Sequence, residues 1–92
     1  MKTSLTRLAG AFTSYFMSGL TYWYEDRLCI DEPEGLERED YGVFTTIEYI
    51  GRNRYKVTKI SYAPHDEVDE EVFINLLPEQ VIMLILVGKR PY

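Results

Sequence analysis

The residues of this sequence that could do chemistry are its charged ones, and they fall into blocks. Residues 25–40 and 66–79 each carry a net charge of −6, while residues 41–65 between them carry +3. Blocks of like charge create fields that steer charged partners toward a surface and favour one orientation. The pattern therefore indicates recognition through patterned surface electrostatics.

General acid–base or nucleophilic catalysis would have to use His65 or Cys29, the only histidine and the only cysteine. Asp66 and Glu67 follow His65, and a carboxylate can orient an imidazole, but the sequence shows no nucleophile held beside it. Cys29 is far from His65 in the sequence, and an isolated cysteine usually behaves as a small buried hydrophobic side chain. We expect no catalytic residues, and a protein that is not an enzyme.

Metal and cofactor sites are also not predicted. The acids after His65 could collect a hard cation through oxygen ligands, but the calcium-loop spacing D-x-[DN]-x-[DN]-G is absent. One cysteine cannot build a thiolate metal cage. Neither G-x-x-x-x-G-K-[ST] nor G-x-G-x-x-G, the glycine loops that hold phosphates, occurs in the sequence.

The first candidate binding surface is a basic hairpin. Arg52, Arg54 and Lys56 lie around its predicted tip, with Tyr49 and Tyr55 beside them. Cationic and stacking side chains together suit a phosphate backbone or exposed RNA bases. The alternative is an edge strand that lysine and arginine protect from aggregation, and both interpretations stay open.

The second candidate surface consists of acidic residues in two predicted loops. They are Asp31, Glu32 and Glu34 in one loop, and Asp66 and Glu67 in the other. Such loops on a small domain would fit a groove lined by lysine and arginine on a protein or ribonucleoprotein that normally holds nucleic acid. A sequence pI near 4.8 argues against a protein that coats duplex DNA without specificity.

The elements that must position these residues begin with a helix over residues 4–24. Leu5, Leu8, Phe12, Phe16 and Trp23 recur at steps of three and four residues or their multiples, which places them on one helical face. A surface loop over residues 31–40, rich in carboxylates and containing a proline and a glycine, should follow.

Residues 43–50 and 55–62 are β-branched and aromatic, which predicts two strands joined by a turn at residues 51–53. In the second strand, Tyr55 and Val57 are in one phase, whereas Ile60 and Tyr62 are in the other. A β-bulge near Thr58 would reconcile the two phases.

The C-terminal part should contain an acidic loop over residues 66–71, a strand over 72–77 and an apolar segment over 81–87. The β-branched residues favour a strand for the last segment, although residues 78–80 are typical of a helix start. We therefore predict one α+β domain over residues 1–92: an amphipathic N-terminal helix packed on a small antiparallel sheet of three to four strands. A second helix near the C-terminus is the alternative for residues 81–87.

Residues 8–20 are moderately apolar, but hydroxyl side chains interrupt them and no cleavage site of small residues follows. We expect no membrane contact and a cytoplasmic location.

In its general character, the whole chain resembles the small acidic α+β proteins that phages encode to evade host defence, including anti-CRISPR proteins. The resemblance is carried by the length, the acid blocks at residues 25–40 and 66–71, the eight tyrosines and the absence of an enzyme motif. Because that group shares no common motif, no functional residue is carried over to this sequence.

The resemblance implies a non-enzymatic, stoichiometric inhibitor acting in the cytoplasm of an infected bacterial host. It would bind a CRISPR–Cas surveillance complex of the Cascade type and block target DNA binding. Such complexes hold guide RNA in a positively charged channel, so the basic hairpin would have a place to contact that RNA. The alternatives are a small RNA-binding module that uses the hairpin, and a structural subunit of a phage assembly.

Overall fold

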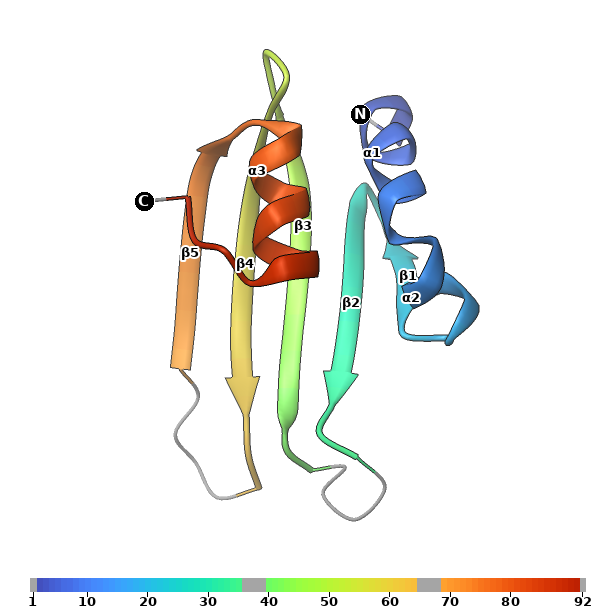
Figure 1. The fold of residues 1–92 in the computed structure, drawn as a ribbon, viewed down its shortest axis with the longest axis vertical. Helices are drawn as coiled ribbons and strands as arrows, with labels where there is room; N and C mark the ends of the chain where they lie inside the picture. The colour runs from blue at the N-terminus through green and yellow to red at the C-terminus, as the bar shows by residue number, and fades with distance from the viewer. Residues whose placement is uncertain (1, 36–39, 65–68, 92) are drawn as a thin grey trace.

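The frame of the protein is a five-stranded antiparallel sheet in which each strand pairs with the next one in the chain. The computed structural model describes residues 2–35, 40–64 and 69–91. Its strands are β1 (Thr21–Tyr24), β2 (Arg27–Pro33), β3 (Gly42–Gly51), β4 (Arg54–Tyr62) and β5 (Asp69–Leu76). The α+β class is confirmed, but the sheet has five strands instead of the three to four that we predicted (Figure 1).

All helices pack on one face of this sheet. Helix α1 (Lys2–Ala9), a 3₁₀ turn (Gly10–Phe12) and α2 (Thr13–Met17) form the N-terminal helical layer. Helix α3 (Pro78–Ile82) continues as a π-helical turn over Met83–Val87 and lies over β4, whereas α1 lies against β2 (Figure 1). The other face of the sheet has no described helix on it.

The core lies between the helices and the covered face. It is one cluster of buried side chains, drawn from α1 with the 3₁₀ turn, from β2 to β5, and from the C-terminal helix: Leu5, Leu8, Ala9, Phe12, Leu28, Ile30, Ile47, Tyr55, Val57, Phe73, Leu76, Val81 and Leu84. In β2 and β4 these residues alternate with side chains on the other face, as the pleat requires.

The predicted helix over residues 4–24 is too long. Gly19 has a φ of 75°, the left-handed conformation that commonly ends helices. Residues 21–24, a threonine followed by three aromatic residues, then pair with β2 as a strand. Trp23 packs against the core, as predicted, although it lies in a strand and not in a helix. Its partner across the strands is the buried Leu28.

The two predicted acidic loops are also shorter than expected. Asp31 and Glu32 lie inside β2 and pair with Phe44 and Val43 of β3. Residues 69–71, predicted to be loop, begin β5. Strand pairing at the end of the sheet gives the backbone N–H and C=O groups their hydrogen bonds. The carboxylates still reach water, so charge repulsion does not prevent strand formation here.

The β3–β4 hairpin is confirmed, with Arg52 and Asn53 both at positive φ in its turn. The bulge predicted near Thr58 is wrong, because β4 alternates regularly through this position. Its two apolar phases serve two faces: Val57 points into the core and Ile60 lies on the face without helices. The structure instead places an extra residue in β5, between Phe73 and Leu76.

The strand that we favoured for residues 81–87 is wrong, and the alternative, a second helix, is correct. Pro78 occupies the start of α3, and the backbone N–H of Leu77 donates a 2.8 Å hydrogen bond to Oε1 of Gln80. Val81 and Leu84 are buried three residues apart, as a helical face requires, whereas Val87 is 67% exposed.

Candidate functional site

The register of the sheet brings the two acid blocks to one end of the molecule. One cross-strand row runs from Asp31 through β3 and β4 to Glu70, and the next row runs from Glu32 to Asp69. Three strand spacings separate β2 from β5, so the rows are about 14 Å wide. Neither row contains a lysine or an arginine.

We call this region the acidic end and define it by its described residues, Asp31, Glu32, Glu34, Asp69 and Glu70. Asp66 and Glu67, the other predicted acidic binding residues, lie outside the described residues. The two acid blocks are separate in the sequence, and the fold brings them together at one end of the sheet.

Tyr62 and Asp31 make the most specific contact at the acidic end. The Tyr62 hydroxyl donates a 2.8 Å hydrogen bond to Oδ1 of Asp31. Burial, followed by this hydrogen bond and the nearby negative charge, raises the pKa of Tyr62 above its ordinary value. The tyrosine therefore stays a neutral donor and holds the carboxylate of Asp31 in place.

A shallow hollow of about 380 Å³ opens beside this contact. Its lining consists of Glu32, Glu34, Tyr41, Gly42, Val43, Ser61, Tyr62 and Ala63. Carboxylates next to aromatic rings are the groups that receive lysine and arginine side chains, through charge and cation–π attraction. This part of the acidic end therefore suits contact with a basic partner.

The basic hairpin tip lies at the opposite end of the sheet. From Gly42 to the tip, β3 extends over about 30 Å, in a molecule whose longest dimension is 39 Å. Arg52 is exposed at the tip, and Arg54 donates a 3.2 Å hydrogen bond to the carbonyl oxygen of Asn75. The acidic end and the tip are therefore too far apart to neutralise each other by contact.

The structure does not bring the predicted hairpin residues into one stacking site. Tyr55 is 2% exposed and packs edge-on against Tyr49, with 5.4 Å between the ring centroids. The Tyr49 hydroxyl accepts a hydrogen bond from the backbone N–H of Asn53. Lys56 is on the opposite face of β4 and pairs with Glu48 of β3. Neither tyrosine can therefore receive a base together with Lys56.

The described residues show no catalytic arrangement. Cys29 is 3% exposed, and burial raises the pKa of its thiol although a hydrogen bond to Thr46 and the charge of Arg27 lower it. A thiol with a raised pKa is a poor nucleophile. No group of three potential metal ligands occurs among the described residues, and His65 is not among them.

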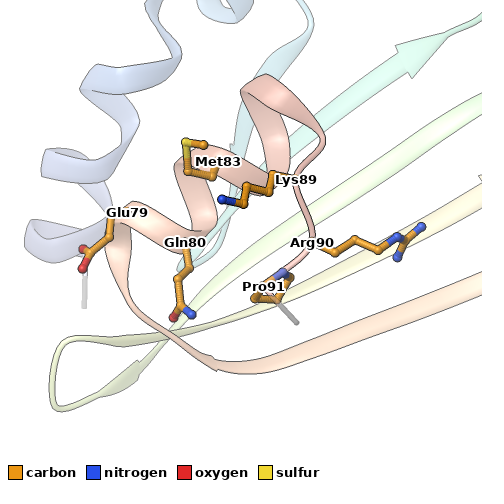
Figure 2. A pocket seen from close by; sticks show the side chains of 6 residues that line it. All are labelled: Glu79, Gln80, Met83, Lys89, Arg90 and Pro91. Atoms are coloured by element: carbon orange, nitrogen blue, oxygen red, sulfur yellow. The ribbon is translucent and has the colours of Figure 1, made fainter.

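A second hollow, of about 210 Å³, lies between α3 and the C-terminal residues (Figure 2). Glu79, Gln80, Met83, Lys89, Arg90 and Pro91 line it. Arg90 extends away from Glu79 in Figure 2 and binds Glu71 of β5. The hollow is smaller than typical ligand pockets, and its polar groups do not converge.

The face of the sheet that carries no described helix, which we call the open face, was not predicted from the sequence. Its apolar residues are Tyr22, Phe44, Ile60, Val72 and Ile74, and Tyr22 and Ile74 are 47% and 58% exposed. The sequence did contain a signal for this face. In residues 55–62, Ile60 and Tyr62 alternate out of phase with the core residues Tyr55 and Val57, and they are the residues that β4 contributes to the open face.

Comparison with protein-family models, with curated proteins and with solved structures finds no match for this chain. Among the described residues, no helix combines the length and apolar character needed to cross a membrane.

Proposed function

We propose that this protein is a non-enzymatic, stoichiometric inhibitor whose acidic end occupies a nucleic-acid groove on a bacterial CRISPR–Cas surveillance complex of the Cascade type. Occupation of the groove would block target DNA binding. The observation that supports this proposal is the meeting of two separate acid blocks at one end of the sheet, in rows without a lysine or arginine.

The acidic end resembles a short stretch of nucleic acid in charge. Asp31 and Glu70 end one row about 14 Å wide on one face of the sheet, and Glu32 and Asp69 end the next row on the other face. Negative charge therefore surrounds this end of the sheet, as phosphates surround a duplex. A field of one sign accelerates association with a groove of the opposite sign and fixes its orientation. Tyr41 and Tyr62 add aromatic area where binding energy is usually concentrated.

The choice of a CRISPR–Cas complex comes from the sequence resemblance and from the positively charged channel of such complexes. Contact with the guide RNA belongs to the same proposal and falls to the exposed Arg52 at the tip. A free-standing RNA-binding module has less support, because Tyr49 and Tyr55 are turned into the core and are not stacking platforms.

The experiment is a binding competition. A purified Cascade-type complex with its guide RNA is mixed with labelled target DNA and increasing amounts of the protein, and DNA binding is measured by gel shift. We expect DNA binding to be lost at about one protein per complex. A variant with Glu32→Lys, Glu34→Lys and Asp69→Lys should need at least about tenfold more protein to inhibit.

The matched control carries the same charge change away from the acidic end, as Glu25→Lys, Asp26→Lys and Glu79→Lys. It should inhibit as well as the wild-type protein. If both triple variants lost inhibition equally, net charge alone would explain the effect, and a role for the acidic end would be contradicted. Absence of binding to the complex at low salt would overturn the proposal itself.

A further inference from the structure

We propose that the open face is self-complementary and binds the open face of a second copy of this chain, with the strands of the two sheets antiparallel. This inference concerns the open face, which shares Asp31 and Glu70 with the acidic end, and it does not depend on the proposed function. It follows from the exposure of the face, from its charge pattern and from the symmetry of a two-fold pair.

The open face exposes apolar side chains on its two edge strands, and Phe44 and Ile60 pair between them in the middle of the sheet. Tyr22, Val72 and Ile74 are 47%, 44% and 58% exposed, and the rings of Tyr22 and Phe44 lie 6.4 Å apart. In residues 2–35, 40–64 and 69–91, no element covers them. Contiguous exposed apolar side chains of this kind mark sites of protein contact.

The charges of the open face are arranged in rows. Arg27, Glu48 and Lys56 form the row toward the hairpin tip, and an ion pair joins Arg27 to Glu48. The row toward the acidic end carries Asp31 and Glu70 and no cation. The row between them, through Cys29, Thr46, Thr58 and Val72, is uncharged.

Nucleic acid does not fit this face. The three cations of this face, Arg27, Arg54 and Lys56, are matched by three carboxylates, those of Asp31, Glu48 and Glu70, so it carries no positive excess. Single-stranded RNA or DNA requires an excess of positive charge along its backbone. A second protein surface with the reverse charge order is required instead.

A second copy of the chain presents the reverse charge order in one of the two symmetric orientations in which the sheets can stack. When two sheets stack face to face, the two-fold axis lies in the interface, either along the strands or across them. An axis along the strands places the acidic rows of the two copies against each other. An axis across the strands, through the uncharged row, places Arg27 over Asp31 of the second copy and Lys56 beside its Glu70.

The size of the face predicts a weak dimer. Five strands at a spacing of about 4.8 Å and with lengths of about eight residues give roughly 600 Å² per copy. Stable interfaces bury about 800 Å² per partner. A reversible equilibrium between monomer and dimer is therefore expected, and not a permanent dimer.

Sedimentation velocity of the full chain, from about 5 to about 500 µM, tests this inference. We expect the mass to rise from one copy toward two across this range. Lys56→Glu and Glu70→Lys should each weaken association by about tenfold, and the double variant should recover most of it. Within one chain, the rows of these residues are about 13 Å apart along the strands, so recovery requires a second copy.

Lys89→Glu and Glu79→Lys are the matched controls, since both residues lie on the helical side of the molecule. They should leave association unchanged, and thermal unfolding of every variant verifies the fold. A monomer at all concentrations would overturn the inference. So would a double variant that associates as weakly as its single parents, or controls that weaken association equally. Association is measured without the surveillance complex, so each of these outcomes is distinguishable from the result of the competition assay.

Discussion

Tyr62, Gly42 and Asp31 join three neighbouring strands at the acidic end. The Tyr62 hydroxyl lies over Gly42 and reaches Asp31 of β2. A Cβ atom at residue 42 would lie 2.5 Å from this hydroxyl, 2.5 Å from the carbonyl oxygen of Glu32 and 2.7 Å from Cα of Pro33. Glycine is therefore required by the close approach of β2 and Tyr62.

Replacing this glycine tests the requirement. Gly42→Ala should lower the free energy of unfolding by about 1–3 kcal/mol, the usual cost of forcing an atom into filled space. Urea unfolding measures the change. Gly10→Ala is the control, because a Cβ atom at Gly10 has no heavy atom within 4 Å and alanine favours helix. A Gly42→Ala protein as stable as wild type would show that the strands separate easily here.

Glu71 and Arg90 form an ion pair with two side-chain hydrogen bonds between the C-terminal residues and β5. These bonds, followed by the charges of Arg90 and Lys59, lower the pKa of Glu71 below its ordinary value of 4.5. A carboxyl with a lowered pKa stabilises the folded state above its unfolded pKa. That stabilisation is lost as the pH falls through the folded pKa.

The Glu71→Gln variant should therefore melt below the wild-type protein at pH 7. The difference in melting temperature should fade as the pH falls below 4.5. The wild-type Glu71 is then protonated, and so it is as neutral as the glutamine of the variant. Melting curves of both proteins from neutral to acidic pH measure it. The difference should be small, because both partners are exposed. A difference that grows toward acidic pH would contradict this account of the ion pair.

Among the elements, the C-terminal helix shows how an all-apolar segment is divided between core and surface. Residues 81–87 are apolar throughout, so their pattern alone does not distinguish a strand from a helix. The helix buries Leu84 to 2% exposure and leaves Leu86 at 42%. Packing against β4, together with the start at Pro78 and Gln80, decides the conformation.

Two leucine truncations test this division. Leu84→Ala should cost about 2–5 kcal/mol in unfolding free energy, because it removes a buried side chain and leaves a cavity. Leu86→Ala should cost less than about 1 kcal/mol, because the side chain is largely in water. Denaturant unfolding of both variants compares them directly. Similar losses would mean that Leu86 is also packed in solution.

At the level of the whole molecule, the sheet separates charge along its length. The acidic end holds carboxylates from β2 and β5 without cations in their rows, whereas Arg52 and Arg54 lie at the far tip. Like charges held close together repel each other and oppose folding. The arrangement of acids at this end should therefore lower the free energy of unfolding.

Salt should relieve this repulsion. Raising NaCl from about 0.02 to about 0.5 M shortens the screening length severalfold, so the melting temperature should rise by a few degrees. A variant with Glu32→Gln, Glu34→Gln and Asp69→Asn should respond less. A melting temperature that falls with salt would instead show that attraction between opposite charges dominates the folded state.

Much of the fold could be predicted where local pattern and final environment agree. The β3–β4 hairpin follows from alternating β-branched residues around a turn, and the buried face of α1 follows from helical spacing. The predictions were wrong where one pattern fits two structures, as at Trp23 and at residues 81–87. They were also wrong where acids were assigned to loops, because strand pairing outweighs repulsion at Asp31 and Glu32.

The order of the residues alone determined the class of the fold, the central hairpin and the blocks of charge, since these depend on contacts between near neighbours. Only the folded chain decided that the two acid blocks meet at one end, that Tyr49 and Tyr55 turn inward, and that one face of the sheet carries no described helix. Those features depend on the pairing of β2 through β5, which joins residues far apart in the sequence. Such pairing is fixed by the packing of the whole core.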